Sequence, residues 1–257
     1  MEERLTDKFL LELRDRMSDM MAAMQLLMPL IRDKGDKKDK EYLAIINKSF
    51  YSLLRSVRHM QVCTSEPDFH PRTIDLAGLC RTVGGQCESV AKTLNVTFEW
   101  SIAQSSILSV GDDNLLEMAL LNLVANAFTA AGSGGKVALR GRQIRDQWVV
   151  TVLDSGPGLR QAKPGEDPFL KTPGGAGLGL EVAWTVAELH GGRVMLVNGG
   201  KRGVRARLLL PIQKPKQGEL VREAHVKIDR GGGFSTTMVE FSPLLPVEEF
   251  SIPNSLD

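Results

Sequence analysis

The sequence predicts an α+β fold in which a helical hairpin is followed by an α/β sandwich. In the N-terminal quarter of the chain, apolar residues recur at alternating steps of three and four, which is typical of helices that pack along a seam. Further on, short β-branched runs alternate with longer helical patterns, as in a sheet covered by helices. We expect a hairpin over residues 1–66, an α/β domain over residues 67–213 and a C-terminal extension without an assigned role over residues 214–257.

Composition excludes several functional classes. A hydrophobic content of 42% and a charged content of 25% are those of a folded globular protein. The net charge of +1 does not favour a nucleic-acid partner. The three cysteines form no CxxC pair, so we expect reduced thiols and no zinc site. No apolar run reaches the ~20 residues that cross a bilayer, and the N-terminus does not resemble a signal peptide. We therefore expect a cytoplasmic protein without direct membrane insertion.

The hairpin is predicted from two apolar seams. The first helix runs over residues 5–31 and is expected to kink or end near Pro29. Its seam residues are Leu10, Leu13, Met17, Met20, Met24, Leu27 and Ile31. The second seam consists of Leu43, Ile46, Phe50, Leu53, Val57 and Met60. Leu11 falls at heptad position b, which faces solvent and is polar in the later heptads.

One hairpin cannot cover an apolar face as wide as this one. Phe9, Met21, Met28 and Leu30 broaden the seam of the first helix. Two hairpins would bury this face in a four-helix bundle, so we expect a homodimer. The alternative is that the hairpin packs on the C-terminal domain of its own chain.

The α/β domain should contain one sheet with helices on one face. The expected strands are 73–76, 96–102, 107–112, 136–143, 148–154, 193–199 and 204–212, and the expected helices are 77–94, 114–131 and 179–190. The C-terminal residues fit no part of this pattern. They are compatible with two short strands around Ser242, or with an ordered arm on a partner.

Three short stretches carry residues suited to nucleotide binding. "NLVANAFTAA" places Asn122 and Asn126 one turn apart on a helix. "DSGPG" follows a strand and spans residues 154–158. "GGAGLGLE", residues 174–181, opens a helix. Each stretch alone is weak, because glycines usually mark turns. Together, in this order and at this spacing, they indicate a site.

The combination resembles the nucleotide-binding domain shared by sensor histidine kinases, DNA gyrase, a heat-shock chaperone and a mismatch-repair protein, known as the Bergerat fold. The resemblance covers residues 75–212 and is strongest to histidine kinases of the nitrogen-regulator type, through "NLVANAFTAAGSGGKV" and "DPFLKTPGGAGLGLEVAWTVAELHGGRV". The preceding hairpin lies where those kinases carry their dimerisation and phosphoacceptor helices. ATP, Mg²⁺ and a response regulator or other signalling partner are what this resemblance implies.

The resemblance also implies residue roles. Asn126 would ligate the magnesium ion, and Asp154 would accept a hydrogen bond from the adenine amino group. Gly156 and Gly158 would let the backbone approach the base. The phosphate-side loop would contain Gly175, Gly177, Leu178 and Gly179. Residues 159–174 would form a lid, with Phe169 as its latch and Lys171 as a phosphate contact.

The physical chemistry of these residues agrees with the implied roles. An amide oxygen is a hard neutral ligand that suits Mg²⁺ with its waters and phosphate oxygens. Glycines before a helix expose N–H groups to phosphates. ATP-hydrolysing relatives carry a Glu at the catalytic position that is Asn122 here, and Asn cannot act as a base. We therefore do not expect hydrolysis to be the main activity.

The phosphoacceptor position departs from the family pattern. Kinases of this family carry "HELR" after a Phe, and this chain reads "FLLELR". Phe9, Glu12 and Arg14 match, but Leu11 replaces the histidine. Glu12 would be the catalytic acid beside the missing acceptor. A hydrocarbon side chain cannot accept a phosphoryl group, and we expect His59 to be an ordinary surface histidine.

Several functions remain compatible with this pattern. The leading one is a nucleotide-dependent regulator of a two-component system that does not autophosphorylate at the usual site. A second is a kinase acting on a partner protein, as anti-sigma-factor kinases do. A third is an interaction module with vestigial ATP binding, which the complete set of nucleotide contacts disfavours. A fourth is an autokinase with another acceptor, such as His59.

Overall fold

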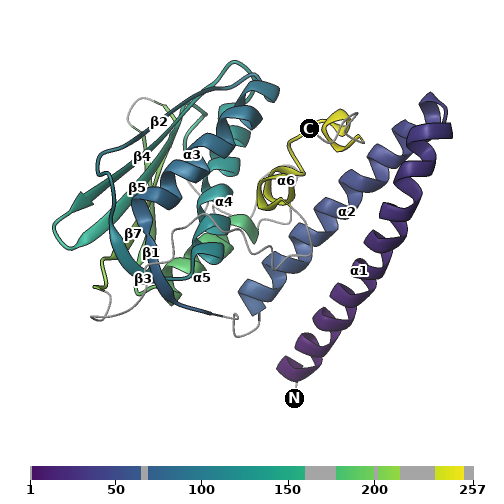
Figure 1. Ribbon diagram of the computed structural model, residues 1–257. Coiled ribbons are helices and arrows are strands. Elements are labelled where there is room, and N and C mark those ends of the chain that lie inside the picture. The colour runs from purple at the N-terminus through teal and green to yellow at the C-terminus, as the bar shows by residue number, and fades with distance from the viewer. Residues whose placement is uncertain (1, 65–68, 160–177, 200–201, 215–234, 252–257) are drawn as a thin grey trace, which may run out of the picture. The chain divides into compact units, whose positions relative to one another are not determined.

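The computed structural model describes residues 2–64, 69–159, 178–199, 202–214 and 235–251 (Figure 1). The chain divides into two compact units. One unit comprises Met1–Glu66 together with Asp229–Asp257, and the other comprises Pro67–Ile228. The predicted α+β fold class is confirmed, because a helical hairpin precedes a mixed sheet with helices.

The hairpin consists of α1 (Glu2–Lys34) and α2 (Lys37–Thr64). Pro29 lies inside α1 and does not end the helix, which reaches Lys34 rather than the expected residue 31. The turn between the helices is held by reciprocal bonds. The backbone N–H of Asp39 donates to Oδ1 of Asp36 at 2.9 Å, and the N–H of Asp36 donates to Oδ2 of Asp39 at 3.0 Å. This arrangement satisfies donors at the start of α2 that no helical carbonyl can reach.

The apolar seam of the hairpin separates into a buried row and an exposed row. The buried row includes Leu10, Met17 and Met24 of α1 with Leu43, Phe50 and Val57 of α2. The other row stays exposed: Met20 and Leu27 are 52% and 50% exposed, and Ile46 and Leu53 are 49% and 41% exposed. One hairpin therefore buries only part of its apolar surface.

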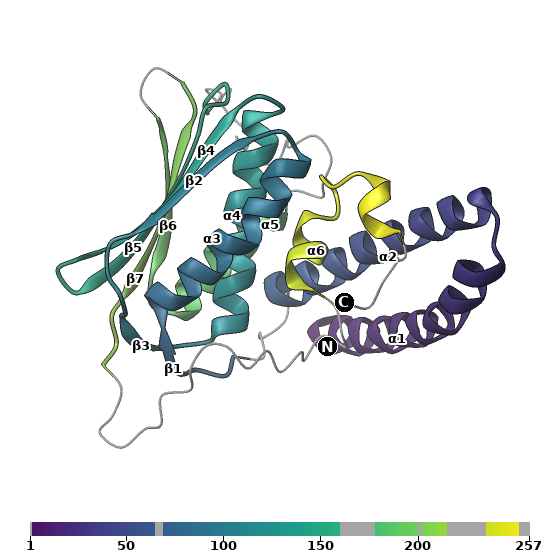
Figure 2. The same cartoon turned by 45° about the horizontal axis from the view of Figure 1, so that its top comes forward.

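The C-terminal residues of the same unit form α6 (Thr236–Phe241) and the 3-10 turn η1 (Val247–Phe250). They are not the two strands that the sequence left open. Both pack along α2 (Figure 2). Val239 of α6 joins the apolar cluster that contains Leu10, Phe50 and Val57. The C-terminal segment is thus part of the core of the hairpin unit.

The second unit contains a five-stranded mixed sheet of order β2-β4-β5-β7-β6. Its strands are β2 (Thr97–Ile102), β4 (Lys136–Ile144), β5 (Gln147–Asp154), β6 (Arg193–Asn198) and β7 (Val204–Pro211). A smaller antiparallel pair joins β1 (Arg72–Asp75) to β3 (Leu108–Gly111). β2 and β4 are parallel, and the other neighbours in the large sheet are antiparallel.

Three helices cover one face of this sheet: α3 (Leu76–Thr93), α4 (Asp113–Ala131) and α5 (Leu178–Leu189) (Figure 1). α4 is apolar on nearly all sides because it lies between the sheet and its neighbouring helices. Among the described helices, α4 alone is long and apolar enough to cross a membrane by length and composition, but two-thirds of it (67%) is buried in the protein. Its composition is that of a core helix.

Candidate functional site

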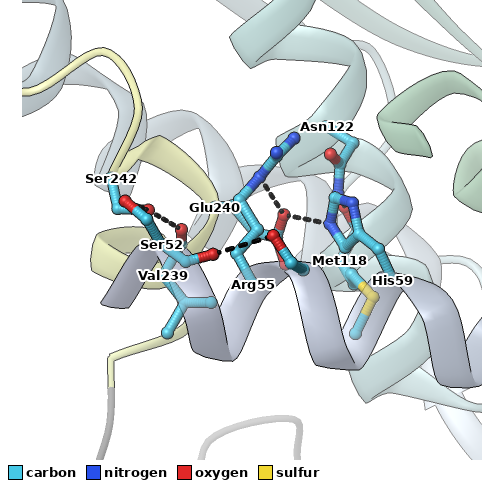
Figure 3. A network of polar contacts seen from close by, with 9 residues as sticks. Ser52, Arg55, His59, Met118, Asn122, Val239, Glu240 and Ser242 are labelled. Carbon is cyan, nitrogen blue, oxygen red and sulfur yellow. Dashed lines mark hydrogen bonds and ion pairs between the residues drawn. The ribbon is translucent and has the colours of Figure 1, made fainter. Parts of the chain in front are cut away.

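Helix α4 carries the two asparagines of the first motif. Asn122 is fully buried, and its side-chain amide donates to the carbonyl of Met118 at 2.9 Å within the same helix (Figure 3). Asn126, one turn further along, is half-buried. Asn126 is therefore the more accessible of the two amides, and its oxygen is a chemically suitable ligand for a hard cation.

The start of α4 is held by a neutral histidine. Nε2 of His190 accepts the backbone N–H of Asp112 at 2.9 Å, and Nδ1 lies 2.7 Å from the carbonyl of Val186. The first bond requires a lone pair on Nε2, so the proton resides on Nδ1. Burial lowers the pKa of His190, although the Val186 carbonyl and Asp112 oppose the shift. Asp112 in turn caps α4 by accepting the N–H groups of Asn114 and Leu115.

Asp154 lies at the end of β5 with both carboxylate oxygens engaged by backbone donors. Oδ1 accepts the N–H of Gly156 at 2.8 Å, and Oδ2 accepts the N–H of Val204 at 3.1 Å. Burial raises the pKa of Asp154, while the two N–H groups favour the ionised form and lower it. A carboxylate fixed in this way can accept a further hydrogen bond from a ligand in one defined orientation.

Glycines around Asp154 allow the backbone to pass close to neighbouring segments. A Cβ atom on Gly156 would lie 2.5 Å from the carbonyl oxygen of Ala130. Gly158 has a φ of +87°, and its position is braced because Asn198 accepts the N–H of Leu159 at 2.8 Å. The contact of Gly156 with Ala130 brings the Asp154 segment against the last turn of α4, about one helical turn from Asn126.

The structure adds Gly203 and Val204 to the site. Gly203 has a φ of +76°, and a Cβ atom there would lie 1.8 Å from the backbone oxygen of Asp154. Its N–H donates to the carbonyl of Gly156 at 2.8 Å. Neither residue belongs to the three motifs from which we expect the site. Strand pairing could have indicated them. Because β5 and β7 are antiparallel, the start of β7 lies beside the end of β5, where Asp154 is located.

The third motif is only partly described. Leu178 begins α5, and Gly179 is buried in its first turn. Lys171, Gly175, Gly177 and the lid over residues 160–174 lie outside the described residues. Helix α5 packs on α4, which carries Asn126. Both helices and Asp154 lie in the second unit.

Residues 111–214 match the family described as "Histidine kinase-, DNA gyrase B-, and HSP90-like ATPase". The adaptive-response sensory kinase SasA of Synechococcus sp. (strain CC9902) is 32% identical over 157 residues, which is 56% of this chain and 40% of SasA. The alginate biosynthesis sensor protein KinB of Pseudomonas aeruginosa is 23% identical over 223 residues, 82% of this chain and 38% of KinB. Residues 111–214 belong to this ATPase family.

The solved structures agree on the fold. The Acinetobacter baumannii histidine kinase AdeS matches 76% of this chain and 95% of its own with a TM-score of 0.55 at 18% identity. The fold of this chain is therefore like that of a histidine kinase. The chain spans about 40% of the length of the curated relatives SasA and KinB.

Leu11, the residue that we expect at the phosphoacceptor position, lies within α1. The predicted exposure of its side chain lies outside what the structure describes. Glu12 is exposed and pairs with Arg16 at 2.9 Å, one turn along the helix. The Glu12 carboxylate therefore takes part in an ion pair on the surface of the helix.

The expectation that His59 is a surface histidine was wrong. His59 is 1% exposed, and its Nε2 lies 2.8 Å from Oε2 of Glu240 in α6 (Figure 3). Glu240 is also buried and forms an ion pair with Arg55 at 3.4 Å. In an isolated hairpin, the heptad position of His59 would place its side chain on the solvent-exposed side of α2. The C-terminal segment covers that side.

Proposed function

We propose that this histidine kinase homologue binds Mg·ATP and works as a nucleotide-dependent switch in a two-component system, without autophosphorylation at the usual position. The observation that carries the nucleotide part is Asp154, whose two oxygens are oriented by the N–H groups of Gly156 and Val204. An adenine amino group can pair with such a carboxylate. A base without that donor would cover the carboxylate without giving it a hydrogen bond in place of its water contacts, which is costly in a partly buried site.

Asn126 is our proposed magnesium ligand. No cluster of three His, Cys, Asp or Glu side chains suited to a metal ion occurs in the part of the chain that the structure describes. A magnesium ion held by one amide must take its other ligands from phosphates and water, and Mg²⁺ commonly binds nucleotides in this way. The ion would neutralise phosphate charge. Gly175, Gly177, Leu178, Gly179 and Lys171 are proposed to line the phosphate side.

The absence of a nucleophile at Leu11 supports the switch over an autokinase. Phosphoryl transfer depends on positioning and requires an acceptor atom, which a leucine side chain lacks. His59 is a poor alternative, because the structure buries it against Glu240. Asn122 cannot serve as a base for water, and its amide already donates within α4. A kinase acting on a partner protein remains the second candidate, and it differs by labelling that partner.

We further propose that two copies associate through the hairpin and that a response regulator or related signalling protein is the partner. The exposed apolar rows of α1 and α2 support the dimer, since a stable surface seldom exposes so many neighbouring apolar side chains. None of Cys63, Cys80 and Cys87 forms a disulfide in the described part of the chain, which supports a cytoplasmic location.

Nucleotide binding is tested with a fluorescent ATP analogue titrated with and without Mg²⁺. We expect binding that depends on magnesium and that Asp154→Asn reduces at least tenfold, because the amide cannot present two acceptor oxygens. Asp146→Asn in the exposed β4–β5 turn is the matched control. Unchanged affinity in Asp154→Asn would remove this residue from the site.

The missing nucleophile is tested with γ-labelled ATP. The wild-type chain should acquire no acid-labile label, alone or with a response regulator encoded beside it. Leu11→His should restore labelling if only the acceptor is missing. Label on the wild-type chain that disappears in His59→Ala would establish an autokinase instead, and label on the partner alone would favour the partner kinase.

A further inference from the structure

The C-terminal segment, residues 235–251, binds one side of α2 through contacts spread along the helix. Nδ2 of Asn47 donates to the carbonyl of Phe250 at 3.0 Å, and Nζ of Lys48 donates to the carbonyl of Leu245 at 2.7 Å. The rings of Tyr51 and Phe250 pack with centroids 5.4 Å apart. These contacts anchor the η1 end of the segment.

The α6 end is anchored by a buried carboxylate. Oε2 of Glu240 lies 2.8 Å from Nε2 of His59 and 3.4 Å from Nε of Arg55 (Figure 3). Burial lowers the pKa of Arg55, and the charge of Glu240 opposes that shift. A buried guanidinium requires a carboxylate partner, so this side of α2 selects an acidic residue at this position. Oγ of Ser52 donates to Oγ of Ser242 at 3.4 Å beside it.

The α2 residues involved form one stripe. Lys48, Ser52, Arg55 and His59 follow at steps of four, three and four, which places them on one side of the helix. The exposed apolar row of Ile46 and Leu53 lies on a different side. The stripe is therefore separate from the proposed dimer surface.

The occupant is a short peptide rather than a domain. α6 has 6 residues and η1 has 4, and helices of this length do not form alone in water. Their structure depends on the contacts with α2, so the segment folds as it binds. Such a segment binds its site because its attachment to the same chain gives it a high effective concentration there. A separate helix with the same pattern of side chains can therefore compete with it for the site.

We propose that the stripe of Lys48, Ser52, Arg55 and His59 is a docking site for a short helix that carries one glutamate between apolar residues. Residues 235–251 of the same chain occupy this site in the structure. They cover this side of α2 until a partner helix with the same pattern displaces them. In the segment itself, the pattern is Val239-Glu240-Phe241. The inference rests on contacts inside the hairpin unit and does not depend on nucleotide binding.

The test uses the 257-residue chain and a fluorescent peptide of residues 235–251. Wild-type chain should bind the peptide weakly because its own segment occupies the site. A chain with Glu240→Lys should bind it at least tenfold more tightly, because its own segment no longer fits beside Arg55. Glu248 is exposed, so a Glu248→Lys chain should behave like the wild type.

Peptide variants distinguish specific docking from non-specific binding. The Glu240→Lys peptide should bind none of these chains, and the Glu248→Lys peptide should bind as the unmodified one does. A chain with Arg55→Glu should prefer the Glu240→Lys peptide, and this reversal guards against variants that merely misfold. Equal binding of both peptides to the opened chain, or no gain in the Glu240→Lys chain, would overturn the proposal.

Discussion

Nε2 of His59 lies 2.8 Å from Oε2 of Glu240, although the two residues are 181 positions apart in the sequence. The pair links α2 to α6, and both side chains are buried. A buried carboxylate that contacts an imidazole and a guanidinium couples the stability of the hairpin unit to the C-terminal segment.

Glu240→Gln should destabilise the hairpin unit. The amide keeps the size of the side chain but loses the charge that pairs with Arg55, and hydrogen bonds to charged groups contribute about 1.5–3 kcal/mol. Denaturant unfolding measures the loss. The exposed control Glu248→Gln should change stability by less than about 0.5 kcal/mol, and an equal loss in both variants would contradict the assignment.

Gly203→Ala should disturb the proposed nucleotide site. An added Cβ would lie 1.8 Å from the oxygen of Asp154, at a φ of +76°, and the left-handed backbone alone costs an alanine about 1–2 kcal/mol. We expect a lower melting temperature and at least a tenfold loss of affinity for an ATP analogue. The control is Gly85→Ala on an exposed part of α3, where a Cβ meets nothing within 4 Å. It should leave binding intact.

The nucleotide-binding domain should lose stability as the pH falls through the ordinary titration range of histidine. Burial lowers the pKa of His190 from its usual 6.5, so the folded state keeps the imidazole neutral where the unfolded chain takes up a proton. Unfolding then takes up protons, and the free energy of unfolding decreases below about pH 6.5. Unfolding curves at several pH values measure this slope. His190→Gln should flatten it, whereas His70→Gln, at an exposed histidine, should leave it unchanged.

Charges in the exposed apolar rows should prevent dimer formation. Met20→Glu and Leu53→Glu each place a carboxylate on the face that the hairpin leaves open, where burial would require removal of its hydration shell. Analytical ultracentrifugation should show dimers for the wild type and monomers for both variants. Ala22→Glu, on an exposed position of α1 away from the row, should remain dimeric. A monomeric wild type would disprove the predicted association.

Much of the ATP-binding domain could be predicted from the sequence because its signals are local. The end of β5 at Asp154 and the course of α4 through Asn122 and Asn126 follow from hydrophobic periodicity and turn residues. The assignment of residues 111–214 to the histidine kinase-, DNA gyrase B- and HSP90-like ATPases is confirmed. The individual roles of Asn126, Asp154 and the glycines stay predictions that the binding experiments test.

The sequence by itself determined the fold class, the two-helix seam and the family, because helix and strand periods repeat over many residues. Only the tertiary structure decided the partners of Asp154 and His59. Val204 and Gly203 reach Asp154 through strand pairing, and Glu240 reaches His59 from α6. Segments as short as α6 carry too few residues for a periodic signal, and contacts between distant residues leave no pattern in a single sequence. Their positions follow from packing, in which burial of Val239 and pairing of Glu240 outweigh weak local preference.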